Sequence, residues 1–312
     1  MIDKDKLSKI GIGTWGIGGF DKRNPNNNDT AQINAIKYMF DKGVNYIETT
    51  LWYSEGHAAK ILAEAISKSN FGRENIFISQ AIYPHKVDTL LQAEAEVSKF
   101  LEMIDSDNLD TVQFTMNGLY KYGVDESIGF FKDLLKTKKT RYISITNSDL
   151  ETLELMHREF KEKFFSHELA FNFEIRNNED LGITKYATRN KILNVVLQPL
   201  RRNRTAMHNW KLLSDLSKKY DKTQNQIILN WTSSKGFLPL VKSENISHID
   251  ENLSAFDFNI EDEDLRDMNN WRPLGYKSPD IDWRMSGKGV APHQLPNIFD
   301  SEYEKQRKQP RH

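Results

Sequence analysis

Hydrophobic and polar positions along the chain alternate between two patterns. Short runs rich in β-branched and aromatic residues precede longer segments whose apolar positions recur at i, i+3, i+4 and i+7. Eight such runs can be counted, at residues 9–13, 44–49, 76–82, 109–115, 142–146, 168–173, 193–198 and 237–241. Helical spacing is clear over residues 31–43, 58–67, 89–104 and 225–236, and Gly43 and Gly236 stand where helices commonly end. Eight strand–helix units predict an α/β fold, a single (β/α)8 TIM barrel.

A doubly wound open sheet is the competing arrangement. The glycine-rich stretch at residues 11–19 looks like a phosphate-binding loop, but no helical pattern follows it. Residues 20–28 are polar and include Pro25 and three successive asparagines, which indicates a loop. The pattern therefore does not support a Rossmann fingerprint.

The composition shifts only near the C-terminus. Five of the nine prolines and three glycines fall after residue 270, so this stretch cannot be regular helix or strand throughout. It also holds Trp271, Tyr276, Trp283 and Phe299, which makes it more aromatic than a typical disordered segment. We expect a barrel over residues 1–270 and an irregular C-terminal tail over 271–312. The tail is either a flap over the barrel mouth or a packed surface segment with a frayed basic end.

Composition narrows the chemistry. The 312 residues carry 43 basic and 44 acidic side chains, a net charge of −1 that gives no electrostatic signature for nucleic acid. The absence of cysteine excludes disulfides, thiolate nucleophiles and cysteine-ligated metals, and the scattered histidines suggest no metal site. No apolar run approaches membrane-spanning length and no signal-peptide pattern opens the chain. We expect a soluble, cytoplasmic protein with a small-molecule substrate; a protein partner stays open.

Four motifs together resemble the aldo-keto reductase superfamily over roughly residues 9–270. They are IGIGTWGIGG at 10–19, NYIETTLWY at 45–53, LVKSENISHIDENL at 240–253 and FDFNI at 256–260. Each is weak alone, but their order and spacing fit the eight-strand count. The resemblance implies one (β/α)8 barrel, an active site at its C-terminal face, and NADP(H) bound without a Rossmann domain.

The resemblance also implies a set of cofactor-binding residues. Cationic donors, hydroxyls and helix N-termini suit a 2′-phosphate, and Lys242, Ser243 and His248 stand at those family positions. Histidine replaces the usual arginine, and a neutral imidazole holds phosphate less firmly. The remaining positions are Glu251 and Asn252 for adenine, and Thr146, Asn147 and Glu168 on the nicotinamide side. The basic stretch at 198–204 is either a pyrophosphate contact or a solvated loop.

The catalytic positions depart from the family pattern. The family uses a tyrosine acid, a lysine, an aspartate and a histidine; only the tyrosine matches, as Tyr53. The aspartate position is Glu48, the lysine position Ala81 and the histidine position Thr115. A nearby cation lowers a phenol pKa and a nearby carboxylate raises it, so Tyr53 is expected to be a weaker acid. Ordinary carbonyl reduction should be slowed, although Thr115 can donate a neutral hydrogen bond.

A substitute proton carrier has several candidates. His57 lies four residues beyond Tyr53, where Ala58 and Ala59 replace the usual serine and glutamate and open space. His85, Lys60 and Lys86 are also near in sequence, but for each of these candidates, His57 included, the sequence favours a solvated loop or helix residue. Trp52 either lines the substrate side or packs on the barrel rim.

Three functions remain. The first is an NADP(H)-dependent oxidoreductase with a rebuilt proton relay, acting on a small carbonyl or alcohol substrate that needs little acid assistance or brings its own. The second is a nicotinamide-binding sensor or partner subunit with little or no turnover. The third is a non-redox isomerase or lyase with Glu48 or His57 as base. Retention of Tyr53 together with the cofactor segment favours the first.

Overall fold

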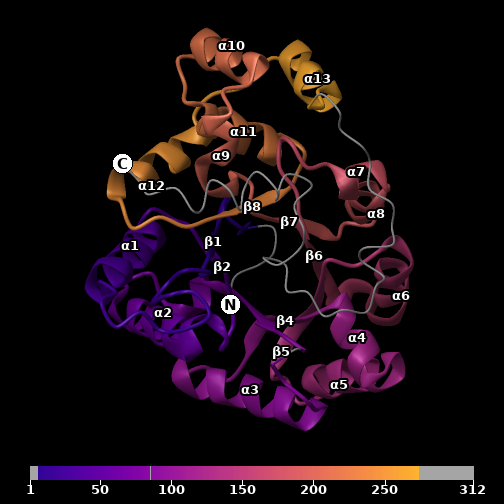
Figure 1. The fold of residues 1–312 in the computed structure, drawn as a ribbon. Coiled ribbons are helices and arrows are strands. Elements are labelled where there is room, and N and C mark those ends of the chain that lie inside the picture. Colours follow the sequence, from indigo (N-terminus) through magenta and orange to yellow (C-terminus); the bar gives the residue numbers. More distant parts are fainter. Residues whose placement is uncertain (1–5, 85, 274–312) are drawn as a thin grey trace.

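A closed barrel of eight parallel strands forms the centre of the molecule in the computed structural model (Figure 1), which describes residues 6–84 and 86–273. The strands are β1 (Gly11–Gly13), β2 (Tyr46–Thr49), β3 (Phe77–Ile82), β4 (Leu109–Thr115), β5 (Thr140–Thr146), β6 (Phe164–Ala170), β7 (Leu193–Leu197) and β8 (Leu238–Val241). They follow one another in sequence order, and β1 pairs with β8 at Gly11↔Leu240 and Ile12↔Val241. This closure confirms the barrel and rules out the open sheet.

Helices surround the barrel and connect successive strands (Figure 1). They are α1 (Asp29–Asp41), α2 (His57–Lys68), α3 (Leu90–Met103), α4 (Met116–Tyr122), α5 (Val124–Lys136), α6 (Leu150–Phe160), α7 (Asn177–Asp180), α8 (Ile183–Arg189), α9 (Arg204–Met207), α10 (Lys211–Tyr220), α11 (Gln224–Ser234), α12 (Ile246–Leu253) and α13 (Asp262–Asn270), with short 3-10 turns that include η2 (Tyr53–Gly56) and η5 (Arg201–Asn203). The four predicted helices correspond to α1, α2, α3 and α11. Gly43 and Gly236 follow α1 and α11 with φ of 87° and 73°, as helix-ending glycines do.

The predicted sixth strand was placed wrongly. The sequence pattern suggested residues 168–173, whereas β6 spans Phe164–Ala170. The apolar residues Phe171 and Phe173 are buried, but they pack against Trp231 of α11 after the strand has ended. Burial outside the sheet therefore produced the same hydrophobic signal as burial within it.

The interior of the barrel changes from aromatic to polar along the strands. Near their amino ends, the Phe77 ring stacks on Tyr46 and Phe165 with centroid distances of 5.3 and 4.5 Å. Further along, the hydroxyls of Thr111, Ser144 and Ser166 form a chain with oxygen distances of 2.8 and 2.7 Å. Hydrogen bonding offsets the cost of burying these groups, and the polar interior leads to the carboxyl ends of the strands.

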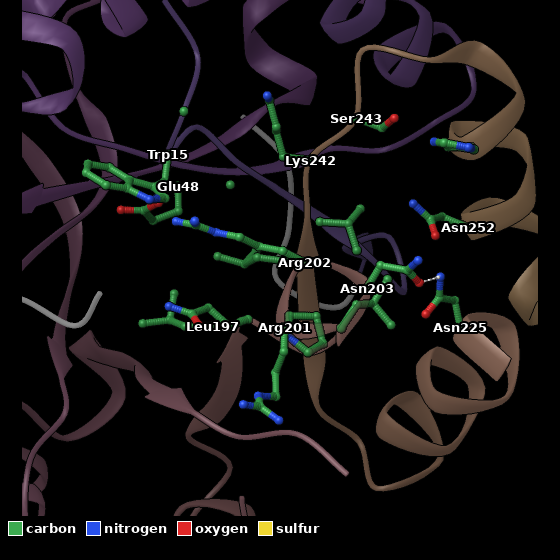
Figure 2. Close-up of a pocket in the computed structure, with 18 of the residues that line it drawn as sticks. Trp15, Glu48, Leu197, Arg201, Arg202, Asn203, Asn225, Lys242, Ser243 and Asn252 are labelled. Carbon is green, nitrogen blue, oxygen red and sulfur yellow. Dashed lines mark hydrogen bonds between the residues drawn. The ribbon is translucent and has the colours of Figure 1, made fainter. Parts of the chain in front are cut away.

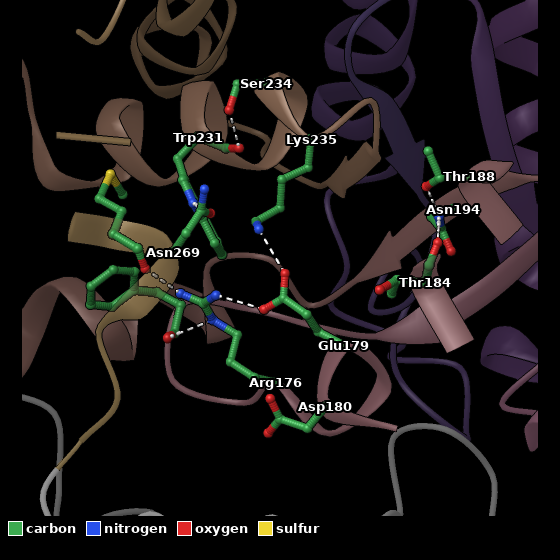
Figure 3. A network of polar contacts seen from close by, with 12 residues as sticks. Arg176, Glu179, Asp180, Thr184, Thr188, Asn194, Trp231, Ser234, Lys235 and Asn269 are labelled. Atoms are coloured by element: carbon green, nitrogen blue, oxygen red, sulfur yellow. Dashed lines mark hydrogen bonds and ion pairs between the residues drawn. The ribbon is translucent and has the colours of Figure 1, made fainter. Parts of the chain in front are cut away.

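A buried arginine attaches the last described helix to the barrel (Figure 3). The Arg176 guanidinium lies 4.1 Å from the centroid of the Trp231 ring and donates to Met268 O of α13 at 2.9 Å. Its ion pair with Glu179 measures 2.9 Å, and Lys235 binds the other oxygen of that carboxylate at 2.7 Å. These contacts hold α13 against the loop that carries Arg176. Most of the predicted tail, residues 274–312, lies outside the described part, as does the flap suggested for it.

Two absences hold for the described residues. None of the helices there is long and apolar enough to cross a membrane. Likewise, residues 6–84 and 86–273 contain no group of three or more histidine and acidic side chains arranged to hold a metal ion.

Candidate active site

A long cavity of about 800 Å³ opens at the carboxyl ends of the strands (Figure 2). This is the end of a (β/α)8 barrel at which side chains from many strands converge. Its lining includes Trp15, Gly16 and Phe20 after β1, Glu48 and Tyr53 at β2, Tyr83 after β3, Thr146 and Glu168 at β5 and β6, residues 197–203 at β7, Gln224 and Asn225 at α11, and Lys242, Ser243, His248, Glu251 and Asn252 at β8 and α12. One cavity therefore includes an inner region around Glu48, Tyr53 and Glu168 and an outer region from Lys242 to Asn252.

Tyr53 lies at the inner end of the cavity among groups without positive charge. Its hydroxyl lies 2.9 Å from the Tyr83 hydroxyl and donates to Glu48 Oε1 at 3.3 Å. The turn that carries it is held by Ser54, which has a φ of 56° and donates its amide hydrogen to Phe20 O at 2.6 Å. The structure thus brings Tyr53 and Glu48 together. It also places Tyr83, which follows β3 and lines the cavity, in contact with the Tyr53 hydroxyl.

A second buried carboxyl, Glu168, lies in the same part of the barrel. Its Oε1 accepts hydrogen bonds from the Tyr46 hydroxyl at 3.0 Å and the Ser79 hydroxyl at 3.1 Å. Gln113 Nε2 donates to Ser79 at 3.2 Å, and Thr146 donates to Gln113 Oε1 at 2.5 Å. The predicted positions Thr146 and Glu168 therefore belong to one hydrogen-bonded network at the cavity floor.

Burial shifts every ionisable group of this inner end toward its neutral form. Burial raises the pKa of Glu48 well above its usual range, and the nearby Glu168 raises it further. Burial also raises the pKa of Glu168 to about 7, against the lowering effect of its hydrogen bonds. The pKa of Tyr53 is raised mainly by burial and then by Glu48. The direction expected from the sequence holds, with desolvation as the larger cause.

Three other sequence candidates are not among the residues that line the cavity. The imidazole of His57 pairs with Asp29 at 2.7 Å and does not line the cavity. Thr115 is buried at the end of β4, beside Thr146 in register, but is not among the lining residues. Asn147 has a φ of 51°, and its buried Nδ2 has no hydrogen-bond partner among the residues described.

The remaining candidates near the rim have structural partners or lie outside the description. Lys86 lies over the Trp52 ring, 3.8 Å from its centroid. Lys60 is exposed on α2, and His85 falls in the gap between the described segments. Ala58 and Ala59 are fully buried against the barrel, so the space they open is occupied by packing.

The outer end of the cavity holds the predicted cofactor segment. Lys242 Nζ pairs with Glu244 at 2.8 Å, and Asn245 caps α12 by accepting from the Ser247 amide at 2.9 Å. Glu251 accepts a hydrogen bond from Thr223 at 2.6 Å. Lys242, Ser243, His248, Glu251 and Asn252 all line the cavity, so the structure gathers the five residues on one wall.

The loop after β7 forms the opposite wall and is held by a buried carboxylate. Gln198, Arg201, Arg202 and Asn203 all have left-handed backbone conformations, with φ between 49° and 70°. Such a run in residues other than glycine persists only where the surroundings fix it. The buried carboxylate of Glu174 holds this loop through its ion pair with Arg201.

Glu174 is fully buried and is contacted by one side chain of this loop and by three that follow it. Arg201 Nη1 forms an ion pair with Glu174 Oε2, and Thr205 donates to the same oxygen at 3.3 Å. His208 Nδ1 and Trp210 Nε1 contact Oε1 at 2.6 and 2.5 Å. Sequence reasoning missed Glu174. The Arg201 side chain turns away from the cavity to pair with Glu174, whereas Arg202 points across the cavity (Figure 2).

Sequence reasoning also missed Tyr83 and the pair Gln224 and Asn225. Tyr83 had a detectable signal, because it lies two residues beyond Ala81 and a strand places such residues on one face. The Gln224 and Asn225 amide oxygens are buried beside the cavity without hydrogen-bond partners in the described part of the chain. Only the fold brings the start of α11 to this wall.

The closed barrel with a polar cavity at its strand ends defines the (β/α)8 class of enzyme folds. Residues 9–272 match the aldo/keto reductase family. The chain therefore belongs to the aldo/keto reductase family, as the sequence motifs indicated.

Curated relatives are similar over most of their length. The uncharacterized oxidoreductase YtbE of Bacillus subtilis is 25% identical over 238 residues, which cover 75% of this chain and 81% of the relative. Glyoxal reductase of the same organism is 25% identical over 253 residues, covering 80% and 86%.

Solved structures show the same fold. The thermostable aldo-keto reductase Tm1743, determined with the inhibitor epalrestat, has a TM-score of 0.77 at 24% identity and covers 84% of this chain and 94% of its own. An aldo-keto reductase from Klebsiella pneumoniae in complex with NADPH has a TM-score of 0.74 at 19% identity, with coverages of 88% and 94%.

Proposed function

We propose that the protein is an NADP(H)-dependent oxidoreductase for a small carbonyl substrate or its alcohol, in which Tyr53, Tyr83 and Glu48 move the proton. One observation carries the proposal: a single cavity joins the Tyr53 hydroxyl to the wall that holds Lys242 and Asn252. A ligand with a phosphorylated end and a reactive end can span these regions. The names of the relatives, among them an oxidoreductase and a glyoxal reductase, support the same class of reaction.

The residues present fit a phosphorylated dinucleotide. Lys242, His248 and Arg202 supply donors at the outer end and along the β7 wall, where phosphates need them. The unpartnered amide oxygens of Gln224 and Asn225 can accept hydrogen bonds from the amino group of a base. The buried Nδ2 of Asn147, next in sequence to the lining residue Thr146, is a donor without a partner in the described chain. When bound, reduced nicotinamide supplies a hydride to the substrate carbon.

The inner end of the cavity handles the proton without a cation. The Tyr53 hydroxyl donates to the substrate oxygen as negative charge develops there. Because burial and Glu168 raise the pKa of Glu48, its carboxyl is protonated in a pH range where an ordinary glutamate is charged. It can therefore return a proton to Tyr53 across their 3.3 Å contact. When Tyr53 gives up its proton, its oxygen becomes negatively charged. The Tyr83 hydroxyl stabilises that oxygen through the 2.9 Å hydrogen bond between the two hydroxyls.

The test separates binding from chemistry. NADPH should quench the intrinsic tryptophan fluorescence, since Trp15 borders the cavity. A panel of small aldehydes and ketones should then oxidise NADPH, read as loss of absorbance at the nicotinamide band. Tyr53→Phe should reduce kcat by roughly 10²- to 10³-fold, the usual effect of removing one donor to the transition state, with little change in NADPH affinity.

The matched control is Tyr38→Phe, because that hydroxyl donates to Asp250 at 2.7 Å on the protein surface. It should leave turnover unchanged. NADPH binding without turnover of any carbonyl would instead support a sensor or partner subunit. Absence of NADPH binding would refute the proposal and favour non-redox chemistry on this barrel.

A further inference from the structure

We propose that the Tyr53 end of the cavity binds a nitrogen cation, and that this protein reduces iminium ions to amines. The inference rests on the proposed function, because it assigns a further substrate class to the same hydride-transfer site.

Two buried carboxyls are the acidic groups of this end, and a bound cation favours their ionised forms. Glu48 and Glu168 are 3% and 1% exposed, and both line the cavity. Neither forms an ion pair with a lysine, arginine or histidine of residues 6–84 and 86–273. The groups that face them are Tyr53 and Tyr83 for Glu48, and Tyr46, Ser79 and Gln113 for Glu168. A cation at this end would meet two acids and no competing positive group among these.

One carboxylate oxygen faces the cavity without a partner. Glu48 Oε1 accepts from Tyr53, whereas Oε2 has no hydrogen-bond partner in the described chain. Because the Glu48 side chain is only 3% exposed and lines the cavity, this oxygen is reached from the cavity, where it can accept a hydrogen bond or contact a positive charge.

Aromatic rings complete the enclosure. The Trp15 and Tyr53 ring centroids lie 5.0 Å apart in an edge-to-face arrangement. Phe20, 5.5 Å from Trp15, is exposed and already has the Arg202 guanidinium over its ring, 5.4 Å from the centroid, so it is not counted as a wall of this end. Tyr83 is 6.1 Å from Tyr53. Aromatic faces attract quaternary and iminium nitrogen through the ring quadrupole. The same rings offer little to an anionic substrate, which the two acids would repel.

Reduction of an iminium ion does not need the proton donation that the family's lysine and histidine, absent from this chain, normally assist. Hydride adds to the iminium carbon, the C=N π electrons become the nitrogen lone pair, and the positive charge passes from substrate to the oxidised nicotinamide. No proton is transferred in either direction, so no acid is required at this step. A ketone, in contrast, becomes an alkoxide that must be protonated.

Cation binding can be measured without turnover. Tetramethylammonium and uncharged tert-butyl alcohol, which are similar in size, are titrated by calorimetry into the full chain without nucleotide. Tetramethylammonium should bind more tightly, and its affinity should rise about tenfold from pH 6 to pH 8, because a group with a pKa of about 7 changes from about one-tenth to nine-tenths ionised. Glu168→Gln should remove this pH dependence, and Glu48→Gln should weaken binding at both pH values.

Glu96→Gln is the matched control. Burial raises the pKa of Glu96 to about 7 as well, but this residue lies on α3 and does not line the cavity. Its replacement should leave the pH dependence unchanged. The inference is overturned if tetramethylammonium binds no better than tert-butyl alcohol, or if Glu168→Gln and Glu96→Gln behave alike while both remain folded by circular dichroism.

Turnover supplies a second, independent comparison. N-methyl-1-pyrrolinium and cyclopentanone share a five-membered ring and differ in charge at the reacting group. The iminium should show at least about tenfold higher kcat/KM. Tyr53→Phe should abolish most ketone reduction while changing iminium reduction by less than about threefold, since no proton is needed.

The outcomes distinguish the two proposals. Ketone turnover without iminium turnover or cation binding would refute this inference and leave the proposed function intact. Absence of NADPH binding would refute the proposed function, while the tetramethylammonium titration would still decide whether the cation site exists.

Discussion

Glu174 is the residue on which the shape of the cavity wall after β7 depends. Its carboxylate is fully buried and is contacted by Arg201, Thr205, His208 and Trp210. Replacing one partner of a buried ion pair typically costs about 3–5 kcal/mol, because the other charge remains buried and unpaired. Glutamine keeps the shape and one acceptor oxygen, so we expect Glu174→Gln to lower the free energy of unfolding by about 3 kcal/mol.

The measurement is urea denaturation of the variant and the parent, followed by far-ultraviolet circular dichroism. A loss of about 3 kcal/mol corresponds to a Tm decrease of roughly 5 °C for a chain of this size. Loosening the anchor should also displace Arg202, so NADPH affinity should fall by roughly tenfold or more, the value of one charge-assisted hydrogen bond. Fluorescence titration measures this second effect.

Glu179→Gln is the comparison variant for this prediction. It also removes a carboxylate partner from a buried arginine, Arg176, but in the network of Figure 3, whose residues do not line the cavity. It should destabilise the protein and leave NADPH affinity unchanged. If Glu174→Gln is as stable as the parent, the magnitude argued from burial is wrong. If it is destabilised but binds NADPH normally, Glu174 does not position the cavity wall.

Two further predictions concern Glu168 and His248. Burial holds the pKa of Glu168 at about 7, above its value in the unfolded chain, so the folded protein keeps a proton that the unfolded chain loses. The free energy of unfolding should therefore fall by roughly 3 kcal/mol as the pH rises from about 4.5 to 7. Glu168→Gln should flatten that decline in denaturation curves recorded at a series of pH values. His248→Arg should increase the preference for NADPH over NADH by roughly tenfold, because a guanidinium binds phosphate in a bidentate manner; equal Kd values for both nucleotides before and after the change would contradict placement of the 2′-phosphate beside His248.

The sequence predicted the barrel because its signal is periodic and repeated. Eight apolar runs alternate with helical segments. The barrel is therefore predicted correctly even where the predicted bounds of a strand are wrong by a few residues. The misplaced β6 shows the limit, since Phe171 and Phe173 are as buried in the loop as strand residues are in the sheet. Hydrophobicity reports burial, and the backbone hydrogen bonds that distinguish strand from loop leave no mark of their own.

The candidate site was predictable where neighbours in sequence are also neighbours in space. Glu48 and Tyr53 come from one strand and the turn after it, and the residues from Lys242 to Asn252 share one loop and helix. Glu174 and its partners lie 27 to 36 positions apart in irregular segments, where no periodicity links them. The sequence also could not predict which arginine faces the cavity. The left-handed backbone conformations of Arg201 and Arg202 determine the directions of the two side chains.

The Glu174 anchor also constrains how this lineage can diverge. A buried acid that loses its arginine, or an arginine that loses its acid, leaves a lone charge in the interior, so either replacement on its own is strongly destabilising. Among homologues, positions 174 and 201 should therefore be exchanged as a pair, with loop conformation changing at the same branch of the tree.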